Sequence, residues 1–168
     1  MKEFDLGEFK VPKRIQKKLK NKEWLKKELA KGKSAQEILE FSDEAMAEFY
    51  GAAHHLLEKK QYLEAADAFL FLVTLNPRNH DYWLGLGMAT QMCGNFDGAI
   101  DAYEMAAMNE LESPVPYFYL AKCFFAIHDR ENALKALDLA VEYAADNAEY
   151  AELKKQAVQA KKLLLGGK

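Results

Sequence analysis

The stretch DYWLGLGMATQMCGNF, residues 81–96, decides the fold because it holds two glycines one residue apart. Closely spaced glycines occur in loops that bind phosphate, but a dinucleotide fingerprint needs a third glycine where Thr90 stands. Such a loop also follows a β-strand, whereas the residues directly before this stretch, NPRNH, form a turn. Gly85 and Gly87 therefore indicate close helix packing rather than a phosphate site.

A repeat of 34 residues, which needs no gap, surrounds this stretch. Its three copies begin at residues 46, 80 and 114. The copies share large aromatics at position four, small residues at positions eight and twenty, and bulky side chains at position twenty-four. In that order these are Phe49, Trp83, Tyr117, then Ala53, Gly87, Ala121, then Ala65, Ala99, Ala133, and finally Phe69, Tyr103 and Leu137. Position seventeen is aromatic in the first two copies, at Tyr62 and Phe96, but is Arg130 in the third.

This pattern resembles the tetratricopeptide repeat, in which a helix, a short turn and a second, antiparallel helix form each unit. Small residues at positions eight and twenty let two helix backbones approach, and the large side chains fill the space beside that contact. A glycine inside a helix costs about 1 kcal/mol relative to alanine, and Gly87 at position eight has this packing role. For Gly85 we expect relief of crowding on the exposed side of the same helix.

Signals for helix ends agree with the repeat. Asn76-Pro77 ends the first copy, and Ser113-Pro114 begins the third. Ser34 to Glu37 has the spacing of a capping box, and Ser42 caps the helix that follows. We therefore predict an all-α protein. Its expected parts are a basic helical N-terminal extension at residues 1–41 and a tetratricopeptide-repeat superhelix at 42–165, with repeats at 46–79, 80–113 and 114–147 and a capping helix at 148–165.

Composition points to a globular protein, because half of the 168 residues are hydrophobic. No run of 18 apolar residues exists, and the sequence at the N-terminus lacks the apolar stretch of a signal peptide. We therefore expect a soluble, cytoplasmic protein. Cys93 and Cys123 stand apart from CxxC and histidine patterns, so we expect both to be small buried hydrophobes in a reducing compartment.

The charge is distributed unevenly along the chain. Residues 1–33 hold 12 Lys/Arg against 5 Asp/Glu, whereas the remainder holds 11 against 21. Within residues 10–33, apolar residues recur at roughly helical spacing and predict one amphipathic basic helix; they are Ile15, Leu19, Leu25 and Leu29. This arm could dock on the repeats or on a second copy of the chain, or contact an anionic membrane or an acidic partner. We expect no nucleic-acid binding, because the body is acidic and Trp24 is the only aromatic in the basic stretch.

Function is expected on the concave face of the superhelix, which the first helix of each repeat builds. In the tetratricopeptide family, positions two, five, nine and twelve of that helix point into the groove. Here they are Ala47, Tyr50, His54, Leu57, Asp81, Leu84, Met88, Gln91, Val115, Phe118, Lys122 and Phe125. This mostly apolar lining suits an extended apolar peptide with few charges. In the alternative interpretation these residues are ordinary core, or the C-terminal helix fills the groove.

Three segments carry a closer resemblance: SDEAMAEFYGAAHHLLEKKQYLEAADAF (42–69), LNPRNHDYWLGLGMATQMCGNFDGAIDAYEMAAM (75–108) and SPVPYFYLAKCFFA (113–126). They resemble the class II chaperones of bacterial type III secretion, the SycD/LcrH-type chaperones of pore-forming translocator proteins, from about Ser42 to Leu153. The resemblance implies that the groove holds an extended Pro-x-Leu-x-x-Pro segment of a hydrophobic translocator before secretion. It also implies homodimerisation through N-terminal helices and no cofactor.

The resemblance extends to single residues and also departs from the family at two of them. Tyr50 and Tyr62 match family tyrosines in and beside the groove, whereas His54 and Leu57 stand where family members carry aromatics, which implies a different pocket shape. The two-carboxylate clamp of repeats that bind heat-shock chaperones is absent. Its positions hold Tyr50, His54, Val115 and Tyr119.

Catalytic patterns are missing from the sequence. His54 and His55 are adjacent, about 100° apart on a helix, and are therefore poor ligands for one metal. We find no nucleophile elbow, HExxH or P-loop, and we predict neither an enzyme nor a metal site. The alternative function is a general tetratricopeptide scaffold or adaptor whose basic arm binds a membrane or a partner.

Overall fold

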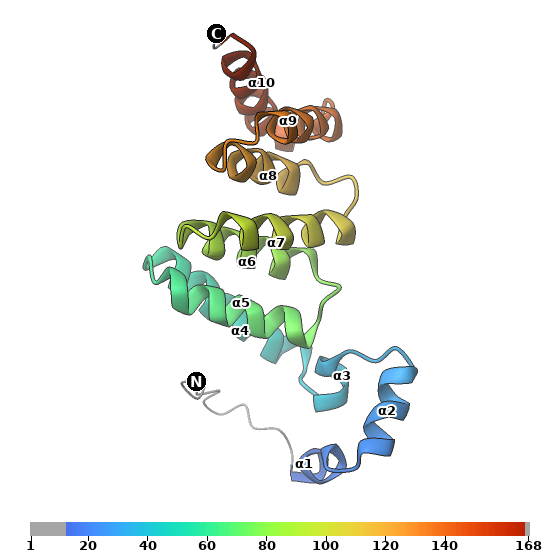
Figure 1. Ribbon diagram of the computed structural model, residues 1–168. Coiled ribbons are helices and arrows are strands. Elements are labelled where there is room, and N and C mark those ends of the chain that lie inside the picture. The colour runs from blue at the N-terminus through green and yellow to red at the C-terminus, as the bar shows by residue number, and fades with distance from the viewer. Residues whose placement is uncertain (1–12, 167–168) are drawn as a thin grey trace.

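The computed structural model describes residues 13–166 as an elongated stack of helices (Figure 1). All regular structure within these residues is helical, as predicted. The helices are α1 (Lys13–Leu19), α2 (Lys22–Ala30), α3 (Ala35–Leu39), α4 (Asp43–Glu58), α5 (Tyr62–Leu75), α6 (His80–Met92), α7 (Phe96–Asn109), α8 (Pro114–Ala126), α9 (Arg130–Ala144) and α10 (Ala151–Gly166), with a 3₁₀ turn at Ala148–Tyr150 before the last. Successive helices from α4 to α10 pack against one another. The division into an extension and a repeat domain stays a prediction.

Polar residues begin most of these helices by accepting a hydrogen bond from the backbone of the first turn. Ser34 forms the predicted capping box with Glu37, and Ser42 accepts from the backbone N–H of Ala45. Asn95 and Asp129 cap the second helices of the second and third pairs in the same way. The predicted helix starts are therefore confirmed where the sequence carried a cap.

Small residues lie buried wherever two helices cross closely. All six small residues at positions eight and twenty are buried, from Ala53 and Ala65 in the first pair to Ala121 and Ala133 in the third. The large side chains at position twenty-four centre two hydrophobic clusters. Phe69 lies in the cluster of α4, α5 and α6, whereas Tyr103 and Leu137 lie in the cluster of α7 to α10.

The two glycines of α6 have the same kind of role, which corrects the expectation for one of them. A Cβ at position 87 would lie 2.5 Å from the ring of Tyr103, in agreement with the predicted packing role. Gly85 is also buried, and a Cβ there would overlap the ring of Phe69. Gly85 therefore does not face the exposed side of the helix. It gives room to the aromatic ring of the preceding pair, whereas Gly87 gives room to the ring of its own pair.

The departure at position seventeen is explained by the end of the stack. The Arg130 guanidinium donates a hydrogen bond to the backbone carbonyl of Leu164 in α10. An ion pair joins Lys161 of α10 to Asp138 of α9. Ala157 of α10 is fully buried. The third pair thus contacts a single capping helix where the first two contact another pair, and an arginine replaces the aromatic.

The basic arm forms two short helices, α1 and α2, and not the single helix that was predicted. The chain turns at Lys20 and Asn21, and Asn21 caps α2. The expected apolar stripe is broken as well, since Ile15 is buried but Leu29 is 53% exposed. The buried residue of α2 is instead Glu28, which pairs with Lys31 and Lys33. Residues 10–12 of the basic stretch lie outside the described residues.

The cysteines differ from each other, which corrects the expectation for one. Cys123 is buried, and burial raises the pKa of its thiol to about 11. Cys93 is exposed because it follows the last turn of α6.

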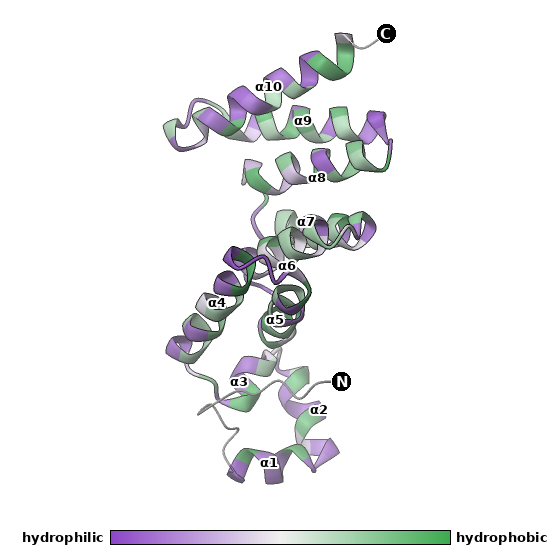
Figure 2. Ribbon diagram, turned by 90° about the vertical axis from the view of Figure 1, so that its left-hand side faces the viewer, coloured by the Kyte–Doolittle hydropathy of each residue, from purple (hydrophilic) through white to green (hydrophobic). Residues whose placement is uncertain are grey.

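Figure 2 shows the hydropathy of the helices, with hydrophilic residues along α4 and α10. None of the helices between residues 13 and 166 has the length and apolar character that crossing a membrane requires.

Candidate concave binding site

Aromatic side chains pack against one another at the N-terminal end of the predicted groove. The ring of Tyr50 on α4 lies 4.4 Å from His54, 5.5 Å from Tyr82 and 6.1 Å from Phe69, measured between ring centroids. His54 also meets Phe69 edge to face, at 5.4 Å. Edge-to-face contacts of this kind favour a fixed arrangement of rings. We call Tyr50, His54, Phe69 and Tyr82 the aromatic cluster.

Burial controls the electrostatics of this cluster. It raises the pKa of Tyr50 and of Tyr82, and the nearby carboxylate of Asp81 adds to both shifts. Asp81 itself is exposed in the first turn of α6. The Nε2 atom of His54 is buried without a hydrogen-bond partner. The cluster is therefore a mainly apolar surface with two carboxylates, Asp43 and Asp81, beside it.

The middle of the predicted groove is joined to the core. Leu84 and Met88 of α6 are half-buried and pack against the hydrophobic cluster of α7 to α10. Gln91 accepts a hydrogen bond of 2.8 Å from the hydroxyl of Tyr103, whose pKa burial raises strongly. Gln91 thus satisfies a buried hydroxyl, a structural role that the sequence pattern did not reveal.

An open cavity occupies the C-terminal end. Its volume is about 440 Å³, and it is lined by Phe118, Ala121, Lys122 and Phe125 of α8, Leu137 of α9, and Gln156, Ala160, Leu163 and Leu164 of α10. Of its aromatic residues, Phe118 is 8% exposed, whereas Phe125 is 60% exposed. We call this the α8–α10 cavity. Three of its residues belong to the predicted groove.

The predicted site residues thus fall into an aromatic cluster, a middle section and a cavity. Of the remaining ones, Leu57 is half-buried against the first hydrophobic cluster. Tyr62 is the first residue of α5 and is half-buried. The sequence analysis did not predict that α10 and the predicted groove residues would enclose an open cavity together. The alternative in which the C-terminal helix fills the groove came nearest to this arrangement, but it named none of the α10 residues, such as Leu163 and Leu164, that line the cavity.

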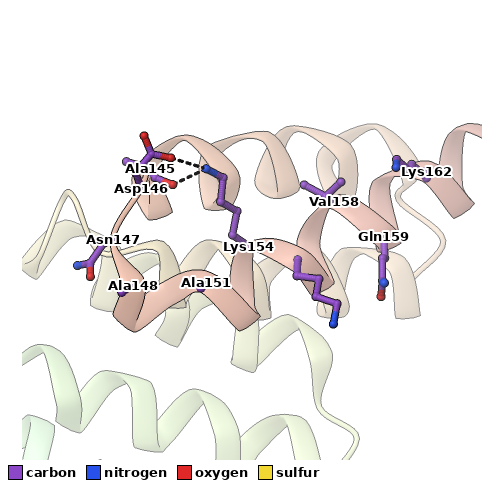
Figure 3. A pocket seen from close by; sticks show the side chains of 10 residues that line it. Ala145, Asp146, Asn147, Ala148, Ala151, Lys154, Val158, Gln159 and Lys162 are labelled. Atoms are coloured by element: carbon purple, nitrogen blue, oxygen red, sulfur yellow. Dashed lines mark hydrogen bonds and ion pairs between the residues drawn. The ribbon is translucent and has the colours of Figure 1, made fainter.

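A second hollow, beside the turn between α9 and α10, has a different character (Figure 3). Its volume is about 520 Å³, and its lining includes Asp146, Asn147 and the lysines 154, 155 and 162. In Figure 3 the side chain of Lys154 reaches back to the Ala145 carbonyl and to the Asp146 carboxylate, the latter at 3.3 Å. These contacts close the turn. Over residues 13–166 no three His, Cys, Asp or Glu side chains gather as metal ligands would.

The helix pairs and their concave residues define a tetratricopeptide-repeat protein, and the family model described as Tetratricopeptide repeat matches residues 80–108. The chain is 30% identical over 114 residues to Low calcium response locus protein H of Yersinia pestis, an alignment that covers 68% of each chain. The chain therefore belongs to the family of Low calcium response locus protein H, and it is also similar to SycD, the type III secretion translocator chaperone of Yersinia enterocolitica.

Solved structures agree with this membership. SycD of Yersinia enterocolitica in complex with a peptide of the translocator YopD is 26% identical, with a TM-score of 0.73 over 75% of this chain and 96% of that chain. The same chaperone has been solved as an alternative dimer, at 27% identity, the same coverage and a TM-score of 0.73. A type III secretion complex from Aeromonas hydrophila is 26% identical, with a TM-score of 0.81 over 84% of this chain and 95% of that chain.

Proposed function

We propose that this protein is a type III secretion chaperone that binds an extended apolar segment of a translocator in its concave groove. In this role it keeps the translocator soluble and apart from other translocators in the bacterial cytoplasm before secretion. The role requires binding alone and no bond-breaking step. The α8–α10 cavity carries the proposal, because it is an open apolar space of about 440 Å³ continuous with the predicted groove residues.

The two ends of the groove suit different parts of an extended peptide. The aromatic cluster offers ring faces and edges with little freedom to rearrange, which favours flat, rigid residues such as proline. The α8–α10 cavity has room for a leucine-sized side chain next to Phe125. A segment of the type Pro-x-Leu-x-x-Pro offers both kinds of residue.

The groove residues proposed to contact the client are the ones that the repeat positions predict. They are Tyr50, His54, Leu57, Tyr62, Asp81, Leu84, Met88, Gln91, Phe118, Lys122 and Phe125. Among them we assign the largest contributions to Tyr50 and Phe125, because both present ring surface that the protein itself leaves partly uncovered. Homodimerisation, as in the alternative SycD dimer, is part of the proposal.

The proposal is tested by fluorescence anisotropy with a labelled peptide of about twelve residues, which spans ~40 Å when extended. The peptide contains Pro-x-Leu-x-x-Pro and is titrated with the protein and with its Tyr50→Ala, Phe125→Ala variant. We expect saturable binding that the double substitution weakens at least about tenfold, or ~1.4 kcal/mol. Phe118 is left intact because it is 8% exposed and its removal would disturb the core.

A matched control removes two exposed apolar side chains outside the predicted groove. Leu63 is 68% exposed and Leu111 is 66% exposed, so a Leu63→Ala, Leu111→Ala variant loses comparable surface and should bind the peptide like the wild type. Circular dichroism verifies that both variants keep their helices. If the wild-type protein does not bind the peptide but binds a charged tail or a folded partner, the proposed chaperone function is wrong and the scaffold function replaces it.

A further inference from the structure

The α8–α10 cavity carries a cation at its mouth. The ammonium of Lys122 lies 4.4 Å from the ring centre of Phe118 and 5.0 Å from that of Tyr119. Lys122 is one of the residues that line the cavity, and it remains exposed. Rings attract a cation through their negative faces, and this holds the ammonium beside the apolar space.

This cation has no carboxylate partner among the described residues. No ion pair or hydrogen bond joins Lys122 to any residue between 13 and 166, whereas Lys154 and Lys161, which also lie near the end of the stack, pair with Asp146 and Asp138. On α10, Glu152 accepts from Gln156 and pairs with Lys155. Glu152 is therefore engaged with other residues of α10, and no Asp or Glu is among the residues that line the cavity.

The environment of Lys122 leaves its charge only partly solvated. Burial lowers the pKa of its ammonium, and the first cause is loss of water rather than a neighbouring cation. A carboxylate brought to this point by a ligand would replace the lost hydration. Of the predicted groove residues, Lys122 alone is permanently cationic, whereas Asp81 stands as an anion in the first turn of α6.

We propose that Lys122 and the α8–α10 cavity form a composite subsite that selects a client segment in which an apolar side chain stands next to an Asp or Glu. The apolar side chain enters the cavity beside Phe125, and the neighbouring carboxylate pairs with the Lys122 ammonium. This inference rests on the proposed function and adds the chemistry of one position of the client. It also orients the client, because Asp81 at the other end of the groove repels an acidic residue there.

The experiment measures binding of a series of peptides of about twelve residues. Each contains Pro-x-Leu-x-x-Pro, is blocked at both termini, and carries a single Asp at a different flanking position, with Asn at the same position as its reference. The readout is the ratio of the Kd of the Asn peptide to that of the Asp peptide. At one position next to an apolar residue we expect a ratio of about three to ten, which falls as NaCl rises from about 0.05 to 0.5 M.

Variants assign this ratio to one side chain. Lys122→Met keeps the apolar stem and should bring the ratio to about one, Lys122→Arg should restore it, and Lys122→Glu should make a Lys peptide the preferred ligand. Lys135→Met serves as the control, since Lys135 is an exposed lysine of α9 that pairs with Glu131 outside this cavity. It removes the same charge and should leave the ratio unchanged.

The outcomes separate this inference from the proposed function. If the peptides bind and the Tyr50→Ala, Phe125→Ala variant weakens them, but no Asp position gives a ratio that depends on Lys122, the subsite is overturned and the chaperone groove stands. A further set of the same peptides with a free C-terminal carboxylate is measured as well, and a gain that appears only in this set overturns the side-chain form of the inference. Failure of every peptide to bind the wild type overturns both proposals.

Discussion

The two ends of the concave face are built from equivalent repeat positions but differ in what covers them. At the N-terminal end, Tyr50 and Phe69 belong to a ring cluster that α6 completes with Tyr82. At the C-terminal end, the ammonium of Lys122 lies over the ring of Phe118, and a cavity remains open against α10. The difference shows that a repeat position sets where a side chain lies, whereas the next helix in the stack decides how much of that side chain stays open as binding surface.

The helix that follows each pair accounts for the contrast. After the first pair comes α6, whose Gly85 makes room for the ring of Phe69. After the third pair comes α10, a single helix held by Arg130 and Lys161. A single helix covers less surface than a pair, so part of the last concave surface stays uncovered.

The largest effect should come from filling the space at Gly85. Gly85→Ala places a methyl group within the ring of Phe69, so we expect destabilisation of about 1–3 kcal/mol from overpacking, less about 1 kcal/mol gained in helix propensity. Urea unfolding followed by circular dichroism measures the change. Disruption should begin in the aromatic cluster, which makes the N-terminal end resemble the looser C-terminal end.

Two further variants isolate the cause of that effect. Gly51→Ala lies in α4 with no atom within 4 Å of the new Cβ, so it should stabilise the protein by roughly 0.5–1 kcal/mol. In a Phe69→Leu background, Gly85→Ala should lower the free energy of unfolding by less than in the wild type, because the ring that overlaps the new methyl group is absent. Additive effects of the two substitutions would contradict direct contact.

The buried positions within the repeats could be predicted from the sequence, but the contacts at the two ends of the stack could not. Positions eight, twenty and twenty-four located the buried side chains, because close helix crossings require small residues and leave space for large ones. Gly85 was misassigned, since its partner Phe69 lies in the preceding repeat and a comparison within one repeat does not reveal it. The sequence left open whether the C-terminal helix fills the groove, and the open cavity could not be predicted because it depends on how α10 lies against α8.

The basic arm shows another limit of pattern reasoning. Helical spacing of apolar residues predicted one helix, but Asn21 caps a new helix and interrupts the spacing. Glu28 is buried because two lysines that follow α2 in the sequence fold back on its carboxylate. Pairing of this kind depends on the turn at Gly32, which adopts a positive φ of 77°, and such a turn is not encoded by periodicity.

A smaller effect should follow from releasing the capping helix. Arg130→Ala removes the hydrogen bond to the Leu164 carbonyl, and we expect a loss of about 1 kcal/mol. The loss should be local, so hydrogen exchange should accelerate in α10 while α4 and α5 keep their protection. Equal acceleration in α4 would contradict a local role, and Lys135→Ala, on the same helix α9, is the matched control.

The smallest effect concerns the arm below the N-terminal end. Hydrogen bonds from Lys31 and Lys33 lower the pKa of Glu28 from 4.5 to about 2. Because this pKa is lower in the folded protein, the unfolded chain binds more protons between the two values, and stability rises with pH there. The stabilisation is complete above about pH 4.5 and is lost as the pH falls through about 2.

NMR titration of the Glu28 carboxyl measures this shift directly. Glu28→Gln should remove the part of the acid sensitivity of α2 that falls in this window, and Glu23→Gln, an exposed carboxylate of the same helix, should not. If α10 showed no change in stability over the same pH range, the acid sensitivity would be confined to the N-terminal end of the molecule. A normal pKa for Glu28 would contradict the pairing.

Because each helix packs mainly against its neighbours in the stack, we expect the superhelix to bend elastically along its length, like a spring. A spring of this kind has one soft coordinate, the curvature that sets the distance between its two ends, while each coil stays rigid. A peptide that contacts both the aromatic cluster and the α8–α10 cavity fixes the distance between the two ends and therefore limits changes in the curvature. Its length then matters as much as its chemistry, since a segment one residue too short must bend the whole stack to reach both ends.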